Sequence, residues 1–384
     1  MKNCNTVLFV SLGPDLTNPA SGAGTRLKYL SRELADQGWR VLALVPSDAS
    51  NSYPDWVAKR YTYNQWSLPL LTDVNPSFVR SLDHVLSSEA IDVIHLSAGV
   101  CAAKALTVLR SETAVVYASQ NVEADHAQDF VNPDLPVFKR FLGPRLIPLI
   151  EWGAVHCADG ITTVSEKDQQ RFIERYGVDK ADVTAVPTGT KAVNHSELEP
   201  PADVRDRLGL GDGSLAVFHG YYEHPPNREA AELIDQQIAP AMREREVDVE
   251  FVLVGQNPPD VSSPNVQAVG FVDDLLSVLN AADVAVVPIL HGGGTKTKLY
   301  DYVSLSLPIV ATKKAVEGID LESKRHGLIT SDVDEEFVSS LMTLIQNKDL
   351  YQQTKGNLAD LARKWSWERS VARCSTAYHD LNNP

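Results

Sequence analysis

A glycine-rich turn next to a lysine and an aspartate is the part of the sequence best suited to hold an anion. The stretch HGGGTKTKLYD places Gly292, Gly293 and Gly294 before Lys298 and Asp301. Where a strand turns into a helix, glycines leave backbone N–H groups uncovered and able to bind a phosphate or diphosphate. In the predicted helix Lys298 lies one turn in, and Asp301, three residues on, projects from the same side. The amine would neutralise phosphate charge and the carboxylate would accept ribose hydroxyls, whereas the alternative is a flexible loop followed by a surface ion pair.

A second glycine-rich turn, NPASGAGTRLKYL, follows the first apolar run of the chain. It lacks the GxGxxG spacing of dinucleotide-binding turns, because Leu27 stands where the third glycine would be. Gly22, Gly24 and Arg26 could close over the same diphosphate from the other half of the chain. A plain connection between secondary-structure elements is an equally open alternative.

Two further polar segments follow predicted strands. The loop SQNVEADHA comes after AVVYAS and carries Asn121, Glu123 and His126, which we expect at the mouth of a cleft between domains. The segment HPPNREA comes after LAVFHG and carries Asn227 and Arg228. Alternatively, Asn227 is a helix N-cap, Arg228 is a solvated first-turn residue, and His126 is an ordinary surface histidine.

Short apolar runs alternate with helix-like segments in both halves of the chain. In the first helix-like segment, Leu27, Leu30 and Leu34 have helical spacing and Gly38 stands where the helix would end. Near-continuous apolar strands between amphipathic helices predict parallel sheets covered on both faces. The predicted strands are TVLFVSL, RVLALVP, IDVIHLSA, AVVYAS, GITTVS and VTAVPTG in the first half, and LAVFHG, VEFVLVG, NVQAVGF, VAVVPI, PIVAT and HGLIT in the second.

The segment NHSELEPPADVRDRLGLGDG interrupts this alternation with adjacent prolines, glycines and charges, which favours a domain junction. The expected fold class is α/β, with two doubly wound Rossmann-like domains facing across a cleft that binds the ligand. The expected boundaries are an N-terminal domain at 1–193, a linker at 194–213, a C-terminal domain at 214–364 and a terminal helix at 365–384.

Composition and charge exclude several other classes of protein. Of the 384 residues, 43% are hydrophobic and 22% are charged, which is ordinary for a globular chain. The balance of 35 Lys+Arg against 50 Asp+Glu gives a net charge of −15, which opposes general binding to nucleic acid. The 4 cysteines form no CxxC pair, which indicates a reducing compartment. The N-terminal apolar run is too short for a signal peptide, and no run approaches the roughly 20 apolar residues of a membrane span. We therefore expect a cytoplasmic protein.

Two suggestive segments have plainer readings. Asp332 and Asp334 in SDVDEEF resemble a metal-binding DxD pair, but acids also favour a helix start, and we expect no required metal. The stretch VFKRFLGPRLIPLI mixes Lys139, Arg140 and Arg145 with aromatic side chains, so it could lie on the inner face of a membrane. The alternative is a helix packed by its apolar face.

The stretch PILHGGGTKTKLYDYVSLSLPIVATKKAVEGID resembles the donor-binding segment of family 4 glycosyltransferases of the GT-B fold. Other segments follow in that family's order over nearly the whole chain. They are PASGAGTRLKYLSRELADQGWRVLALVP, SQNVEADHA, ADGITTVSEKDQQRF, VTAVPTGT, FHGYYEHPPNREA, VEFVLVGQNPPD and VGFVDDLLSVLNAADVAVVP. The terminal WSWERSVARCSTAY looks like the helix that crosses back onto the first domain.

The resemblance implies a role for each matching residue. Its donor-binding set is Gly22, Gly24, Arg26, Gly220, Gly292, Gly293, Gly294, Thr295, Lys298 and Asp301. Asn121, Glu123 and His126 would lie on the acceptor side, and the implied catalytic set is Lys298, Arg228, His126 and Glu123. Members of the family usually carry two acids eight positions apart, whereas this chain has Gly293 at the first and Asp301, instead of glutamate, at the second.

The resemblance implies a retaining transfer of a sugar from a nucleoside diphosphate-sugar to a hydroxyl acceptor, either a glycan, a lipid-linked compound or a small molecule. The nucleotide-sugar is a co-substrate, and no other cofactor is implied. Two alternatives remain open on the same architecture. One is a nucleotide-sugar 2-epimerase, and the other is a nucleotide-sugar-binding pseudoenzyme that lacks activity because the first acid is missing.

Overall fold

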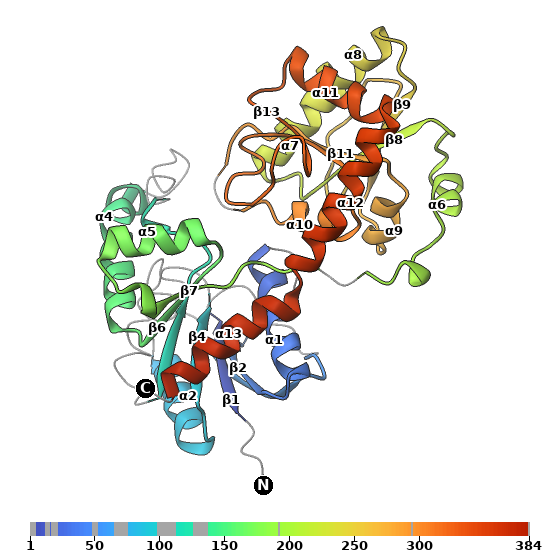
Figure 1. The fold of residues 1–384 in the computed structure, drawn as a ribbon. Helices are drawn as coiled ribbons and strands as arrows, with labels where there is room; N and C mark the ends of the chain where they lie inside the picture. The colour runs from blue at the N-terminus through green and yellow to red at the C-terminus, as the bar shows by residue number, and fades with distance from the viewer. Residues whose placement is uncertain are drawn as a thin grey trace. The chain divides into compact units, whose positions relative to one another are not determined.

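The computed structural model of the chain describes residues 5–11, 16, 22–47, 53–64, 76–97, 113–125, 137–190, 193–292 and 295–382. The chain divides into two compact units (Figure 1). Unit 1 comprises Met1–Gly189 and Trp367–Pro384, and unit 2 comprises Thr190–Ser366. Because Trp367–Pro384 returns to unit 1, the chain passes between the units twice.

Unit 1 is built on one parallel sheet, whose seven described strands have the order β3-β2-β1-β4-β5-β6-β7. The strands are β1 Thr6–Ser11, β2 Arg40–Pro46, β3 Val57–Tyr63, β4 Val93–Ser97, β5 Ala114–Ala118, β6 Gly160–Thr163 and β7 Val183–Ala185. The helices are α1 Gly22–Asp36, α2 Pro76–Ser88, α4 Val137–Cys157, α5 Glu166–Tyr176 and α13 Trp367–Asn382, with short 3-10 turns η1 Glu123–Asp125 and η3 Lys180–Asp182. The order reverses direction between β1 and β4, as in doubly wound folds.

Helices α1 and α13 lie side by side on one face of this sheet (Figure 1). Leu27, Leu30 and Leu34 of α1 are buried in the same core cluster as Val371 and Tyr378 of α13. The leucine spacing of the sequence is therefore confirmed as the buried stripe of a helix. Gly38 follows with φ +91°, which glycine adopts at little cost after a helix end. On the other face, α2 packs over β1, β2 and β4.

Unit 2 contains a second parallel sheet, in which the six described strands have the order β10-β9-β8-β11-β12-β13. The strands are β8 Ser214–His219, β9 Val249–Val254, β10 Val266–Gly270, β11 Val284–Val287, β12 Ile309–Thr312 and β13 Gly327–Thr330. The helices and turns are η4 His195–Glu197, α6 Pro201–Leu208, α7 Pro225–Leu233, a π-helical turn η5 Ile234–Ile238, α8 Ala239–Glu244, α9 Leu275–Asn280, α10 Lys298–Ser304, α11 Glu335–Gln346 and α12 Lys348–Lys364. The predicted strands of both halves are present, and the structure adds β3.

The carboxyl ends of β8, β9 and β10 approach one another closely through glycines. The Gly220 N–H donates to Val254 O at 2.9 Å, and the Gly255 N–H donates to Gly270 O at 2.8 Å. A Cβ on Gly255 would lie 1.9 Å from Gly220 O, and Gly255 has φ +132°, so a side chain is excluded there. The sheet thereby presents bare backbone at this edge.

Several helix boundaries differ from the sequence prediction. Helix α10 begins at Lys298, so this lysine is the first helical residue and not one turn in, and the helix ends at Ser304, before Pro308. Helix α7 begins at Pro225, so Asn227 lies in its first turn and is not the N-cap. Its continuation η5 buries Ile234 and Ile238 in the core of unit 2. Segment 194–213 contains α6, whose Val204 packs in the core of unit 2.

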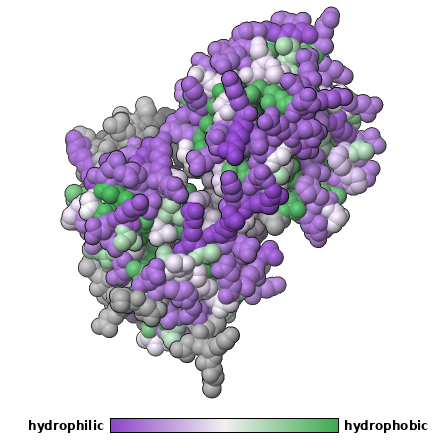
Figure 2. Space-filling view, in the orientation of Figure 1, coloured by the Kyte–Doolittle hydropathy of each residue, from purple (hydrophilic) through white to green (hydrophobic). Residues whose placement is uncertain are grey.

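The Asp332-Val333-Asp334 segment is a helix start, as the sequence predicts. Asp334 is the N-cap of α11 and accepts hydrogen bonds from the N–H groups of Glu336 and Phe337. None of the described helices is long and apolar enough to cross a membrane. Figure 2 shows a face on which hydrophilic residues predominate and apolar patches are scattered between them. Leu149 and Trp152 of α4 are among the exposed large apolar side chains, with 69% and 53% of their area accessible.

Candidate functional site

The carboxyl end of β8 and the start of α10 bring an amine, an amide and a carboxylate together in unit 2. The Lys298 amine donates to Asn227 Oδ1 at 2.8 Å and lies 3.8 Å from the centre of the Phe218 ring. The Asn227 amide nitrogen donates to Tyr221 O at 2.9 Å, which directs its oxygen toward the lysine. A Cβ on Gly220 would meet the Asn227 nitrogen at 2.9 Å and the Lys298 amine at 3.1 Å. Only glycine at position 220 therefore leaves this arrangement undisturbed.

Burial changes the acid–base properties of the lysines at this turn. Lys298 is only 8% exposed, and burial, followed by the nearby Lys296 charge, lowers its pKa well below the usual lysine value. Burial also lowers the pKa of Lys296 to about 8, and the Lys314 charge contributes in the same direction. Lys296 donates to Gly292 O at 3.3 Å. A bound anion would favour the charged forms of both amines.

Asp301 faces a histidine from the neighbouring strand. Its Oδ2 lies 3.5 Å from Nε2 of His219, the last residue of β8. His219 is buried, and both its backbone N–H, at 3.2 Å, and its ring Nδ1, at 2.9 Å, contact the Tyr302 hydroxyl. The carboxylate and the Lys298 amine thus belong to the same helix but have different neighbours.

The glycine-rich turn is described only in part. Gly292 has φ +94°, and a Cβ there would lie 3.0 Å from Pro226, so the turn requires glycine at this position. Thr295 is half-buried in the segment before α10. Gly293 and Gly294 lie outside the described residues. Because α10 has only 7 residues, its dipole adds little, and the positive charge at this turn comes from the lysines.

The Arg228 guanidinium is held by backbone carbonyl groups of unit 2. Its Nε donates to Tyr222 O at 3.2 Å and its Nη2 to Asn257 O at 3.4 Å. The side chain is half-buried, so it differs from the solvated first-turn residue that the sequence left as an alternative. Its contact with a diphosphate stays a prediction.

The three donor-binding residues predicted in unit 1 lie in α1. This helix already begins at Gly22, so Gly22 and Gly24 form its first turn and not a preceding loop. The Arg26 side chain is 5% exposed; it donates to Thr188 Oγ1 at 3.3 Å and makes a short hydrogen bond to Val186 O. These bonds tie α1 to the segment after β7, and the contact of Arg26 with a donor stays a prediction.

Glu151 of α4 holds the loop after β5 in place. This loop carries two of the predicted acceptor-side residues, Asn121 and Glu123. The Glu151 carboxylate is buried and accepts from the N–H groups of Glu123, at 3.0 Å, and Ala124, at 2.9 Å. It also accepts from the hydroxyls of Tyr117, at 3.3 Å, and Tyr176. Burial, and then the Glu151 charge, raises the pKa of Tyr117 well above its usual value, so this hydroxyl stays a donor.

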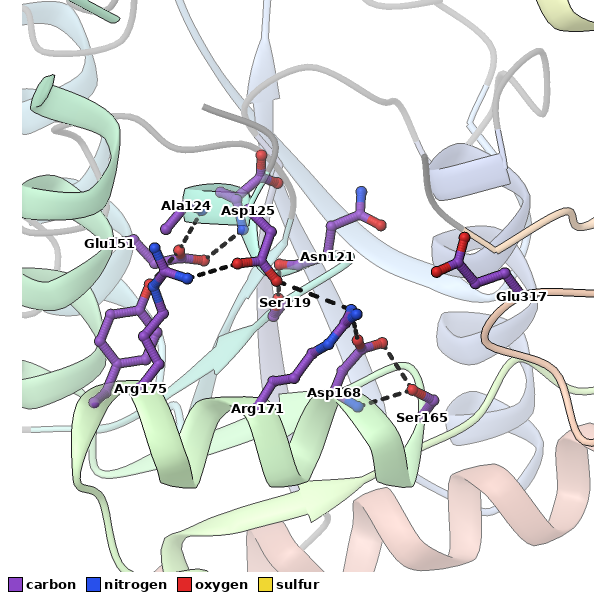
Figure 3. A network of polar contacts seen from close by, with 12 residues as sticks. Ser119, Asn121, Ala124, Asp125, Glu151, Ser165, Asp168, Arg171, Arg175 and Glu317 are labelled. Atoms are coloured by element: carbon purple, nitrogen blue, oxygen red, sulfur yellow. Dashed lines mark hydrogen bonds and ion pairs between the residues drawn. The ribbon is translucent and has the colours of Figure 1, made fainter. Parts of the chain in front are cut away.

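A cluster of charged side chains borders this loop (Figure 3). Asp125 lies 2.6 Å from Arg175 and 3.9 Å from Arg171, and Arg171 lies 3.3 Å from Asp168. The Asn121 side chain stands apart from these ion pairs, and its backbone oxygen accepts a short hydrogen bond from Ser119 (Figure 3). Asn121 and Glu123 thus share one loop of unit 1, whereas His126 lies outside the described residues.

Sequence reasoning missed His219, Tyr302, Lys296 and Glu151. His219 ends a predicted strand directly before Gly220, and that position at a strand end was the signal available for it. Glu151 is the single carboxylate in the apolar run LIPLIEWGAV, and a lone acid in such a run signals a buried polar contact. Among the described residues, no group of three or more His, Cys, Asp or Glu side chains is arranged to hold a metal ion.

Two sequence models of protein families match the chain. The one described as Glycosyl transferases group 1 matches residues 213–347, and the one described as Glycosyltransferase Family 4 matches residues 20–192. The first match contains β8 and α10, and the second contains the loop with Asn121 and Glu123. A search of curated proteins gave no match.

Solved structures with the same fold include several glycosyltransferases. Sucrose-phosphate synthase of Thermosynechococcus elongatus superimposes with a TM-score of 0.71 at 17% identity, covering 98% of this chain and 99% of that one. HepE of Anabaena, in complex with UDP and glucose, has a TM-score of 0.65 at 14% identity, covering 96% and 99%. A glycosyltransferase of Rickettsia africae has a TM-score of 0.71 at 11% identity, covering 99% of both chains. At these identities the likeness establishes the fold, which is GT-B.

Proposed function

The chain belongs to the group 1, family 4 glycosyltransferases, and from this premise we propose that it is a retaining enzyme. It moves a sugar from a nucleoside diphosphate-sugar to a hydroxyl group of an acceptor. The acceptor is a glycan, a lipid-linked compound or a small molecule. The structure of Anabaena HepE with UDP-glucose supports UDP-glucose as the first donor to examine.

The observation that carries this proposal is the Lys298 amine at the carboxyl edge of the unit 2 sheet. It is buried and bonded to an amide oxygen, with no carboxylate within ion-pair distance among the described residues. A lysine in an ordinary surface ion pair would be exposed and paired. Ligands of open parallel sheets bind beyond the carboxyl ends of the strands, where this amine lies. A diphosphate would supply the missing negative charge.

Asp301 complements the lysine in this proposal. A carboxylate beside phosphate groups would repel them, but it accepts hydrogen bonds from ribose hydroxyls. We assign Asp301 to the ribose, Lys298 to the diphosphate, and the N–H groups of the Gly292–Thr295 turn to the phosphate oxygens. Gly220 leaves the space that the Lys298 amine needs. Arg228 would also contact the diphosphate once its guanidinium releases the carbonyl oxygens of Tyr222 and Asn257.

The reaction then proceeds by stabilisation of the leaving group. The bond between the anomeric carbon and the phosphate oxygen breaks, and Lys298 stabilises the charge that develops on the diphosphate. The acceptor hydroxyl forms the new bond on the same face of the sugar, and its proton passes to the departing phosphate oxygen. No side chain of the protein forms a covalent bond with the sugar. Because the lysines supply the positive charge, we propose that no metal is needed, and activity that persists in excess EDTA would support this.

We assign acceptor binding to unit 1, through Asn121, Glu123 and His126. The Glu151 contacts hold the backbone of this loop in place, which favours a defined position for the Glu123 side chain. His126 is assigned on its sequence position alone.

The proposal is tested by incubating the purified chain with UDP-, GDP-, ADP- and TDP-sugars and pools of glycan, lipid-linked and small hydroxyl acceptors. We expect nucleotide release that requires an acceptor, and a product whose anomeric configuration, read by NMR, matches the donor. Nucleotide release without an acceptor, together with an epimerised sugar, would contradict transfer. Donor binding without any turnover in every pool would contradict an enzyme.

A further inference from the structure

The Tyr302 hydroxyl makes two contacts, and both are with His219. It lies 3.2 Å from the His219 backbone nitrogen and 2.9 Å from ring Nδ1. Tyr302 is fully buried, and the described residues offer its hydroxyl no other partner. Burial raises the pKa of Tyr302 well above its usual value, so the hydroxyl keeps its proton.

This pair of contacts determines which ring nitrogen of His219 carries a proton. A backbone N–H can only donate, so it occupies one acceptor site of the hydroxyl oxygen. The hydroxyl proton is then left for Nδ1, which must accept it as a lone pair. If Nδ1 carried a proton instead, the buried hydroxyl proton would have no acceptor. This cost lowers the population of the Nδ1–H tautomer relative to the Nε2–H tautomer by about tenfold or more.

The remaining proton of the neutral ring must therefore be on Nε2. This nitrogen lies 3.5 Å from Asp301 Oδ2, so its N–H faces the carboxylate. The contact is longer than an ordinary hydrogen bond, but a partial positive charge at this distance still attracts and orients the carboxylate. The reverse tautomer would turn a lone pair toward the carboxylate and repel it.

We propose that Tyr302 fixes His219 in its Nε2–H tautomer, and that His219 thereby positions the Asp301 carboxylate for the ribose hydroxyls. His219 is a positioning residue in this scheme, because it acts through Asp301. The ribose part rests on the proposed function, whereas the tautomer is a property of the ligand-free protein and can be tested without it.

The tautomer is read directly by long-range proton–nitrogen NMR of the full chain labelled with nitrogen-15 in histidine. The His219→Gln variant identifies which signal belongs to His219. We expect an Nε2–H ring with an accepting Nδ1 in the ligand-free wild type near neutral pH. An Nδ1–H ring, or a doubly protonated ring, would overturn the proposal.

The positioning role is tested by comparing affinities for UDP and 2′,3′-dideoxy-UDP, which lacks the ribose hydroxyls. We expect the wild type to bind UDP about tenfold more tightly, as for hydrogen bonds to a charged group. In Tyr302→Phe, which removes only the hydroxyl that fixes the ring, this ratio should fall at least about threefold. A purely structural defect would weaken the binding of both nucleotides equally and leave the ratio of their affinities unchanged.

Tyr222→Phe is the matched control, because Tyr222 is also fully buried and its hydroxyl donates to Phe218 O at 3.1 Å. This variant should keep both the His219 tautomer and the nucleotide ratio. A Tyr302→Phe protein with an altered tautomer and the wild-type ratio would overturn the positioning role. If the wild type bound neither nucleotide, the proposed function and the ribose role would both fail, but the NMR result would still decide the tautomer.

Discussion

At the scale of single residues, the Lys298 amine is the group whose removal should cost most in the reaction. Its contact with the diphosphate strengthens as the leaving group gains charge, so its effect is larger in the transition state than in the bound donor. We expect Lys298→Ala to lower kcat/KM by an amount that corresponds to about 1.5–3 kcal/mol of lost transition-state stabilisation. The effect on kcat should be larger than the effect on donor affinity. Steady-state kinetics measure kcat and kcat/KM, and a donor titration measures the affinity.

The matched control is Lys348→Ala, because Lys348 is an exposed lysine at the start of α12 in the same unit. It should leave both constants unchanged. Full turnover and unchanged nucleotide affinity in Lys298→Ala would instead show that the turn is only a loop next to a helix.

The two lysines at the glycine-rich turn should make nucleotide binding depend on pH. Burial lowers the pKa of Lys296 to about 8 and that of Lys298 well below the usual lysine value. A bound diphosphate favours the charged amines, so it raises both pKa values and binding takes up protons. Above neutral pH, the affinity for the nucleotide should therefore be highest at the lower pH values. It should fall as the pH rises through about 8.

Calorimetry in two buffers with different enthalpies of ionisation measures this proton uptake. The nucleotide remains fully ionised above neutral pH, because a terminal phosphate has its second pKa at about 6, so the trend belongs to the protein. The Lys296→Met variant should flatten the dependence. An affinity that is constant or rises with pH over this range would contradict charged amines at the site.

At the scale of elements, helix α4 sets the position of the loop that carries Asn121 and Glu123. Replacing Glu151 with glutamine keeps the shape of the side chain but turns one of its oxygens into a donor, so one of its backbone N–H partners loses its acceptor. Each such loss costs about 1–3 kcal/mol when buried. We expect Glu151→Gln to raise the acceptor KM while UDP affinity stays unchanged, because the proposed nucleotide site lies in unit 2.

Glu368→Gln, on the exposed face of α13, is the control and should change neither constant. If Glu151→Gln raised the acceptor KM and weakened UDP binding by the same factor, general unfolding instead of loop positioning would explain both effects.

The close approach of β8 and β9 makes a second prediction at this scale. In Gly255→Ala the new Cβ would lie 1.9 Å from Gly220 O at φ +132°, so the strand ends must separate. We expect a loss of about 2–4 kcal/mol in the free energy of unfolding, measured in urea. Gly356→Ala in α12, where a Cβ meets nothing within 4 Å, should instead stabilise by about 0.5–1 kcal/mol. An unchanged stability in Gly255→Ala would contradict the described strand edge.

The sequence predicted every described strand except β3, but it did not predict the contacts between the elements. Apolar runs in the sequence indicate buried strands. The edge strand β3, VAKRYTY, is largely solvent-facing and has no such run. The pairing of Lys298 with Asn227 joins residues far apart in the chain, so no local pattern could indicate it. The same is true of His219 and Asp301. The start of α10 was misplaced because glycines and threonines upstream of Lys298 leave the helix boundary undetermined.

At the scale of the whole molecule, the net charge of −15 works against the binding of any anion. A nucleoside diphosphate must therefore be held by local charges, and the proposed site supplies them through Lys296 and Lys298. Because this positive charge is local, removing a single amine should weaken an interaction that the rest of the surface opposes.

The measurement that tests this most directly is calorimetric titration of UDP, GDP, ADP and TDP into the wild type and into a Lys298→Ala, Asp301→Asn double variant. We expect saturable binding of at least one nucleotide to the wild type, with one site per chain. In the double variant that affinity should fall by about a hundredfold or more, as expected when two charged contacts are lost. The absence of binding for all four nucleotides, or equal binding by both proteins, would contradict a nucleotide-sugar site at the carboxyl edge of the unit 2 sheet.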